Sequence, residues 1–351
     1  MSILGGLDIH RGQITFDYVN TDSGEVRTGK IRDPHRERLR AWLGELPTTD
    51  AEFVMEGCTG WLYIEQELTA AGMRARVADP AEAAALKGNK KRAKTDRADA
   101  KHLRMLLTDD RVPDSYIPSE HVRQARSLGR LYLDLLHDRA RWTQRVHATL
   151  FHHGAPSLKG ALDTPEGLVK ANHHLAKLPQ VDEYAAHVAL RTIATLSEEM
   201  KPVRQRLLWI GRHQAGAKAI QSIYGIGELT GPVIWAEIGD ASRFGSSRQV
   251  VRHSGLDVSI HDSDGNRSAG HITRQGPPAL RWALYEAGMC ASRKSSPDNA
   301  YYNEVRKRTH HKAAVMSVAR KHARRCFHIL KDLGDEATAE PSTNRKAPPL
   351  G

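Results

Sequence analysis

The chain has 351 residues, of which 52 are lysine or arginine and 41 are aspartate or glutamate, so its formal net charge is +11. No apolar run approaches the roughly 18 residues of a membrane span, and the N-terminus lacks the basic and apolar regions of a signal peptide. Three cysteines without a CxxC pair argue against a disulfide framework and a structural zinc site, and they fit a reducing cytoplasm. The basic balance makes nucleic acid the leading candidate partner, and a merely solvated positive face is the alternative.

Short strands alternate with helices over residues 1–112. Apolar runs and turn signals predict strands at 3–9, 13–20, 25–31, 51–56 and 74–78, and helices at 35–46, 61–71 and 81–86. Three antiparallel strands are thus followed by two more strands, each of which is reached through a helix. This order predicts a mixed sheet of the α/β class.

Two long amphipathic helices are predicted in the middle of the chain, at 122–150 and 181–212, with a polar connection between them. Such a pair predicts an antiparallel hairpin or a dimerising coiled coil, and an ordinary helical subdomain is an equal alternative. We assign 113–215 to this segment and 216–333 to a mostly helical domain. The tail, 334–351, holds few large apolar residues, so we expect it to be disordered.

Four carboxylates are predicted to converge in the first domain. Asp8 lies on the first strand and Glu56 ends the fourth, and these strands are neighbours in the predicted sheet. Asp96 and Asp99 are three residues apart, which places both on one face of a helix that could pack beside the strand ends. Carboxylates this close repel one another unless a divalent cation binds, and Mg²⁺ prefers such oxygen ligands. As the alternative, each acid is an ordinary surface charge, and Asp96 is a helix N-cap.

A basic stretch at 87–101 adjoins these acids. It would draw phosphate to the same place as the metal. We assign nucleic-acid binding to four of its residues: Lys91, Arg92, Lys94 and Arg97.

The order of these motifs resembles the DEDD signature of RuvC-like domains with an RNase H fold. More narrowly, it resembles the DEDD transposases of insertion-sequence family one-hundred-ten. The stretch 56–60 is close to that family's Glu-x-Thr-Gly segment, with one inserted residue. The resemblance implies a RuvC-like domain over 1–112, in which Asp8, Glu56, Asp96 and Asp99 are the catalytic and metal-binding residues for Mg²⁺, with Mn²⁺ as the second option.

The segment 223–240 predicts a helix-hairpin-helix. Gly225 and Gly227 would let the hairpin backbone come close to a phosphate, which its N–H groups and the next helix N-terminus could hold. A tight turn between two packed helices is the alternative.

Residues 244–285 resemble the transposase domain of the same family, where a Gly-Leu segment precedes a Ser-Gly loop, a basic hairpin and a Leu-Arg helix. By position, the family's serine nucleophile is Ser263. A serine hydroxyl can attack a phosphodiester once a base or metal activates it. Three arginines could neutralise the phosphate: Arg267, Arg274 and Arg281.

This chain departs from the family pattern at two points. Val258 stands where the family has proline, and Asp264 separates the serine from its glycine. Ser259 and Ser268 compete for the assignment, and a turn serine without a catalytic role is a further reading of Ser263.

The motifs and the resemblance together predict a transposase or recombinase of a bacterial insertion sequence. The resemblance also implies a bridge RNA that pairs with donor and target DNA. The composition predicts a cytoplasmic protein without a membrane partner, and we expect such a bacterial DNA enzyme to be nucleoid-associated. The resemblance further implies a homo-oligomer, a dimer or tetramer, in which the acids of one protomer meet the serine of another. Two alternatives are a RuvC-like, structure-specific endonuclease that uses metal-activated water, and a non-catalytic nucleic-acid binder.

Overall fold

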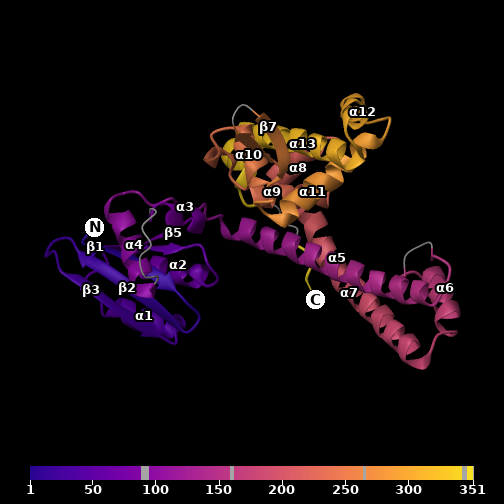
Figure 1. The fold of residues 1–351 in the computed structure, drawn as a ribbon. Helices are drawn as coiled ribbons and strands as arrows, with labels where there is room; N and C mark the ends of the chain where they lie inside the picture. The colour runs from indigo at the N-terminus through magenta and orange to yellow at the C-terminus, as the bar shows by residue number, and fades with distance from the viewer. Residues whose placement is uncertain (88–94, 159–161, 264–265, 342–345, 351) are drawn as a thin grey trace. The chain divides into compact units, whose positions relative to one another are not determined.

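A five-stranded mixed sheet organises the first of two compact units, Met1–Ile117, in the computed structural model. The second unit is Pro118–Gly351, and the structure describes residues 1–87, 95–158, 162–263, 266–341 and 346–350. Figure 1 shows the elements of each unit. Those of the first are β1 (Ile3–Ile9), β2 (Gln13–Asn20), β3 (Val26–Arg32), β4 (Ala51–Glu56), β5 (Arg74–Ala78), α1 (Arg36–Gly44), α2 (Trp61–Ala70), α3 (Pro80–Ala85) and α4 (Asp96–Thr108).

The strand order in this sheet is β3-β2-β1-β4-β5. The strands β1, β2 and β3 pair antiparallel, whereas β1 with β4 and β4 with β5 pair parallel. The predicted mixed α/β sheet is confirmed, as is the prediction that the first and fourth strands are neighbours. This arrangement is compatible with an RNase H-like fold.

Alternation along the strands gives the sheet two different faces. Leu7 and Phe53 belong to a core with α1 and α2, whereas Val54 packs with α4 on the other face. Gly6 lies under α4, and a Cβ atom at this position would stand 2.1 Å from the carbonyl oxygen of Ala100. The helix can therefore lie close to β1 only because this position has no side chain.

The described part of the second unit is helical apart from a two-stranded antiparallel hairpin, β6–β7. None of its helices, nor any in the described first unit, is long and apolar enough to cross a membrane. Its elements are α5 (Glu120–His152), α6 (Pro165–Leu175), α7 (Gln180–His213), α8 (Ala215–Ala219), η1 (Ile220–Ser222), α9 (Thr230–Ile238), η2 (Ala241–Arg243), α10 (Ser247–His253), β6 (Val258–Ser263), β7 (Asn266–Ile272), α11 (Pro278–Met289), η3 (Cys290–Ser292), α12 (Asn299–Arg308), α13 (His311–Leu333) and η4 (Gly334–Thr338).

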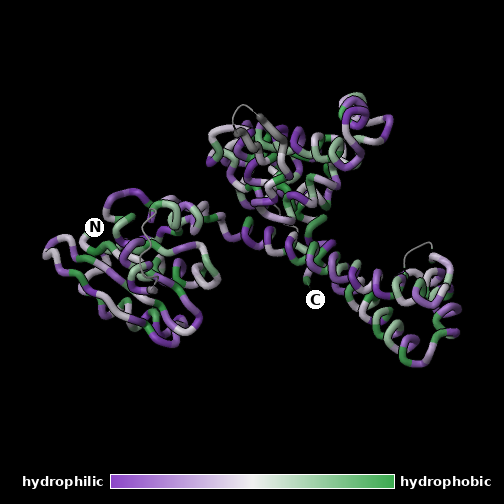
Figure 2. The backbone as a smooth tube through the Cα atoms, viewed as in Figure 1, coloured by the Kyte–Doolittle hydropathy of each residue, from purple (hydrophilic) through white to green (hydrophobic). Residues whose placement is uncertain are grey.

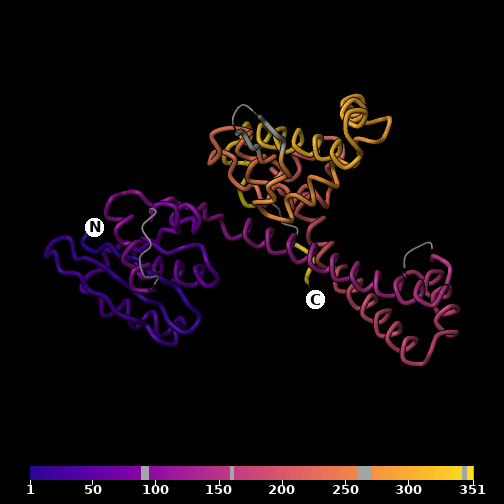
Figure 3. Tube along the Cα trace, in the orientation of Figure 1, coloured from indigo at the N-terminus to yellow at the C-terminus, as the bar shows by residue number. Residues whose placement is uncertain are grey.

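The two predicted long helices are confirmed as α5 and α7, which lie side by side as an antiparallel pair (Figure 3). Apolar residues recur along both helices (Figure 2), and Val146, Leu150 and Ile193 are buried between them and α6. The connection includes α6, a helix that the sequence did not predict; Thr164 caps it and Pro165 starts it.

A second core joins α5 and α7 to the C-terminal helices. It contains Val122 of α5, Leu207 of α7, Trp235 of α9 and Phe327 of α13. Because these contacts place 118–351 in one compact unit, the boundary at 215 stays a prediction.

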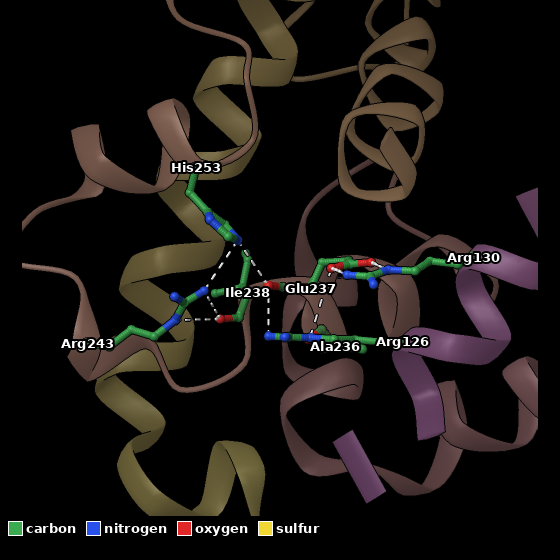
Figure 4. Close-up of polar contacts among 7 residues, drawn as sticks. All are labelled: Arg126, Arg130, Ala236, Glu237, Ile238, Arg243 and His253. Carbon is green, nitrogen blue, oxygen red and sulfur yellow. Dashed lines mark hydrogen bonds and ion pairs between the residues drawn. The ribbon is translucent and has the colours of Figure 1, made fainter. Parts of the chain in front are cut away.

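Three arginines and one histidine surround the C-terminal end of α9 (Figure 4). Arg126 and Arg243 donate to main-chain carbonyls of its last turn, at 2.6 and 3.1 Å. Arg130 binds the buried Glu237 carboxylate with two nitrogens, at 2.7 and 2.9 Å, and Nε2 of His253 lies 3.2 Å from the Glu237 carbonyl oxygen. Arg126 and Arg243 complement the negative end of the helix dipole. The two arginines of α5 connect α9 to that helix, and His253, whose pKa burial lowers to about 4, connects it to α10.

The start of the C-terminal tail is packed, which differs from the expectation of disorder from Gly334. The helix η4 buries Ala337, whose carbonyl oxygen accepts from Nε1 of Trp235 at 2.6 Å. Composition alone missed this contact, because one small apolar residue and one carbonyl oxygen are enough to fix the segment. For the remainder of the tail, disorder stays a prediction.

Candidate metal centre

Asp8 and Glu56 lie on the face of the sheet that α4 covers. Side chains alternate along a strand, so Asp8 shares the face of Gly6. The parallel register, with Leu7 opposite Met55, places Glu56 beside Asp8 on this face. The two carboxylates therefore stand at the carboxyl ends of neighbouring strands, as the sequence predicted.

The first turn of α4 brings two further carboxylates to this edge. Thr95 caps the helix, and Asp96 and Asp99 follow where the positive end of the helix dipole favours acids. Gln13 of β2 donates from Nε2 to Oδ2 of Asp96 at 2.7 Å, and Asp99 accepts from Nζ of Lys87 at 2.8 Å. Acids from three separate elements thus gather at one edge of the sheet.

Asp8, Asp96 and His10 form a compact group of metal-ligating side chains. One ligand atom from each lies within 4.8 Å of the others. Nε2 of His10 lies 3.1 Å from Oδ2 of Asp8 and 3.6 Å from Oδ1 of Asp96. The sequence analysis missed His10, which lies two residues after Asp8 and one residue beyond the end of β1; this spacing was the only sequence signal for it.

The Asp8 carboxyl is destabilised in its charged form. Burial is the main reason that its pKa is raised; the charges of Asp96 and Asp99 raise the pKa further, and His10 opposes them. Negative charge is therefore concentrated where solvent is partly excluded, and a divalent cation with oxygen ligands would relieve it. The donor set fits the divalent cation that the family resemblance implies.

Glu56 stands near this group without belonging to it. Burial raises the pKa of the Cys58 thiol, and the nearby charges of Glu56 and Asp8 raise it further. Both carboxylates are therefore close enough to act electrostatically on one thiol, although Glu56 supplies none of the three ligand atoms that meet.

Part of the predicted phosphate-binding stretch falls outside the described residues: Lys91, Arg92 and Lys94. Arg97 is exposed in the first turn of α4, one residue after Asp96. Positive charge on described residues is thus present beside the acids, in Arg97 and in the Lys87 ammonium paired with Asp99.

The two glycines of the predicted helix-hairpin-helix have different surroundings. Gly225 has a positive φ of 97°, and a Cβ there would stand 2.4 Å from the carbonyl oxygen of Ala287, so this glycine serves close packing on α11. Gly227 faces open space, and its N–H donates to Oγ1 of Thr230 at 3.1 Å. A phosphate-binding role for this loop stays a prediction.

The hairpin β6–β7 carries the predicted nucleophile. In its register Ser263 pairs with Asn266, and Arg267 pairs with Asp262. The side chains of 260–269, including those of Ser263, Arg267 and Ser268, lie outside what the structure describes. The competing Ser259 uses its hydroxyl to donate to the carbonyl oxygen of His271 at 3.1 Å.

Two arginines lie at the base of this hairpin. Arg281 donates from Nη1 to the carbonyl oxygens of Ser254 and Gly276, at 3.2 and 3.3 Å. Burial lowers the pKa of Arg281, and the nearby charge of Arg274 lowers it further. Positive charge is therefore concentrated there, although the described contacts of Arg281 are with the protein's own backbone.

A mixed sheet that is compatible with an RNase H-like fold, with acids gathered at one edge, is the arrangement expected of a DEDD transposase. A model of the DEDD transposases of IS110 type matches residues 5–153, and a model described as "Transposase IS116/IS110/IS902 family" matches residues 217–303. The two matches together cover more than half of the chain. The protein belongs to the DEDD transposases of the IS116/IS110/IS902 family.

Individual relatives are distant. An uncharacterized protein of insertion element IS116 from Streptomyces clavuligerus is 26% identical over 43% of this chain and 38% of its own length. A Pseudomonas aeruginosa protein named a probable family 20 transposase is 25% identical over 38% of this chain and 43% of its own. The chain therefore spans less than half the length of these two relatives. A Sinorhizobium fredii protein, y4pF/y4sB, named as a candidate transposase, is 24% identical over 80% of this chain and 70% of its own.

Proposed function

We propose that this protein breaks and rejoins DNA at the ends of a bacterial insertion sequence. The observation that carries the proposal is the meeting of Asp8 and Asp96, which come from β1 and from α4, at the carboxyl edge of the sheet. Clustered carboxylates in a partly solvent-excluded place are costly without a compensating charge, and a site that keeps them is suited to a divalent cation, Mg²⁺ or Mn²⁺. Glu56 and Asp99 complete the proposed set of acidic residues.

The chemistry we propose is strand transfer through a serine. When bound, a divalent cation lowers the pKa of an attacking hydroxyl and offsets charge on the phosphate oxygens. Oγ of Ser263 forms a bond to phosphorus while the P–O bond to the leaving nucleotide breaks, and the serine proton ends on the released hydroxyl. Arg267, Arg274 and Arg281 are the proposed partners of the phosphate.

The partners in this proposal come from the family resemblance. They are DNA, a bridge RNA that selects donor and target, and further copies of the chain in a dimer or tetramer. The net charge of +11 supports a polyanionic partner, and the paired helices α5 and α7 suit the proposed dimerising role of 113–215.

A covalent protein–DNA adduct is the test of the serine mechanism. The full chain is incubated with its element ends, co-purified RNA and Mg²⁺, and the products are separated on denaturing gels. We expect an adduct that is lost in Ser263→Ala and in Asp8→Ala, and that persists in Ser259→Ala, Ser268→Ala and the exposed control Asp22→Ala.

The second candidate function is a RuvC-like nuclease that uses activated water, because the acid cluster lies within the first unit and needs no serine to bind a cation. Cleavage without an adduct that survives Ser263→Ala but not Asp8→Ala would establish this alternative. If the parent forms neither an adduct nor a cleavage product, and neither substitution changes its binding of DNA, the protein is a non-catalytic binder.

A further inference from the structure

The position of His10 relative to the two acids is compatible with that of a metal ligand. Two ligands that lie about 2.1 Å from one ion are about 3.0 Å apart when adjacent and about 4.2 Å apart when opposite. The distances from Nε2 of His10 to Oδ2 of Asp8 and Oδ1 of Asp96, 3.1 and 3.6 Å, fall within this range. Because the three ligand atoms all lie within 4.8 Å of one another, one ion could contact all three after a modest movement of the side chains.

The tight connection between β1 and β2 fixes His10 in this place. The backbones of His10 and Gln13 exchange two hydrogen bonds, at 2.9 and 3.3 Å. Gln13 then donates to Oδ2 of Asp96, which leaves Oδ1 as the oxygen nearer to His10. His10 and Gln13, at the two ends of one turn, thus lie near different oxygens of the Asp96 carboxylate. The turn therefore orients the His10 imidazole relative to that carboxylate.

We propose that His10 is a direct ligand of the divalent cation held by Asp8 and Asp96, and that its imidazole makes the site prefer Mn²⁺ to Mg²⁺. The proposal rests on the metal site of the proposed function. Imidazole nitrogen binds transition metals well, whereas Mg²⁺ favours oxygen ligands and retains water. In the metal-bound form Nε2 is unprotonated and turns its lone pair to the ion, and the ring proton resides on Nδ1.

A different role would give the same distances without a metal. A protonated His10 could serve as the counter-ion of the two carboxylates, and a bound cation would then displace it. The two roles differ in one observable, which is whether the imidazole nitrogen bonds to the ion.

Pulsed electron paramagnetic resonance of the full chain loaded with Mn²⁺ separates these roles, because the echo envelope is modulated by a directly bonded ¹⁴N nucleus. We expect ¹⁴N modulation in the parent and in the control His328→Ala, whose imidazole is exposed on α13. We expect no modulation in His10→Ala, with Mn²⁺ affinity about tenfold weaker in titration calorimetry and Mg²⁺ affinity changed by less than about threefold.

A second variant, His10→Asp, tests whether weaker metal binding in His10→Ala comes from a general loss of folding. It supplies an oxygen ligand instead of nitrogen, so we expect metal binding to persist with the preference shifted toward Mg²⁺. Mn²⁺ binding without ¹⁴N modulation in the parent, or modulation that survives His10→Ala, would overturn the role of His10 and leave the acidic site standing. Absence of Mn²⁺ binding in the parent would overturn the metal site as well.

Discussion

The Asp17 carboxylate of β2 accepts from the Arg104 guanidinium of α4, and the pair lies between sheet and helix with only 3% and 12% of the two side chains exposed. Arg104 follows Asp96 by eight residues, which is about 12 Å along the helix axis. The ion pair therefore anchors the C-terminal half of α4 to the sheet, and the first turn of the same helix carries Asp96 and Asp99.

Replacing Asp17 by asparagine should loosen α4 from the sheet. The substitution leaves a mostly buried guanidinium without its counter-charge, which costs about 3–5 kcal/mol. Hydrogen–deuterium exchange of the α4 amides measures this cost as a lower free energy of opening. The exposed turn residue Asp22, changed to asparagine, should shift the same amides by less than about 0.5 kcal/mol. Equal exchange in both variants would contradict the proposed role of the pair.

A methyl group at Gly6 should displace α4 and impair the metal site. The new Cβ would stand 2.1 Å from the Ala100 carbonyl oxygen and 2.6 Å from the Arg104 nitrogen, and both are backbone atoms that cannot move independently. We expect Gly6→Ala to weaken Mn²⁺ binding at least about tenfold in calorimetry, because Asp96 moves with its helix.

Gly44 offers a matched control for that change. It ends α1, and a Cβ there meets nothing within 4 Å. Alanine is favoured over glycine in a helix by about 1 kcal/mol, so Gly44→Ala should leave metal binding unchanged and stabilise the protein slightly. Weakened Mn²⁺ binding in both variants would show that the close approach of α4 to Gly6 is not the reason for the loss of metal binding.

The acidic residues could be placed from the sequence because strand geometry is periodic. Once Asp8 and Glu56 are assigned to adjacent parallel strands, period-two alternation fixes their common face. The helical spacing of Asp96 and Asp99 likewise fixes their direction. His10 could not be recognised in the same way, because its partner Asp96 is distant in the chain and the contact depends on how closely α4 approaches the sheet.

The short helices α6 and η4 show the opposite limit of sequence reasoning. The segment of α6 does show a helical spacing, since Ala171 and Leu175 are buried one turn apart, but it is short and lies within a largely polar connection. The segment of η4 is too short to show any period, so its composition favours disorder. It is ordered by the burial of Ala337, a contact with no periodic signature because one residue and its tertiary partner suffice.

The free energy of unfolding should fall as the pH decreases from about 6.5 to about 4. Burial lowers the pKa of His253 to about 4, and the charge of Arg243 lowers it further. In the unfolded chain His253 takes up a proton near pH 6.5, whereas in the folded chain it does so only near pH 4, so protons favour unfolding between these values. Above pH 6.5 His253 is neutral in both states and does not change the free energy of unfolding. At about 1.4 kcal/mol per pKa unit, the loss is about 3 kcal/mol.

Urea unfolding at several pH values measures this loss, and His253→Gln should reduce it. The reduction is partial, because His322 is also buried with its pKa lowered to about 4. The exposed His328→Gln should keep the full pH dependence of the parent. A His253→Gln profile that follows the parent over the whole interval would show that His253 does not titrate as its burial requires.

Removing η4 should destabilise the second unit, whereas removing the residues beyond it should not. The Ala337 carbonyl accepts from Trp235 at 2.6 Å and from Nε2 of Gln214 at 3.3 Å, and Gln214 also reaches the Ala339 carbonyl at 3.1 Å. A chain that ends at Leu333 leaves these two buried donors without these acceptors, at about 1–3 kcal/mol for each. Urea unfolding followed by tryptophan fluorescence should therefore show a clear loss of stability.

A chain that ends at Pro341 is the control for this truncation. It keeps both carbonyl acceptors and the buried Ala337, so we expect its free energy of unfolding to stay within about 0.5 kcal/mol of the parent. If the two truncated chains unfold at the same urea concentration, the contacts of η4 contribute nothing to the stability of the unit. A difference between them assigns the stabilisation to residues 334–341, because the two chains differ only in this segment.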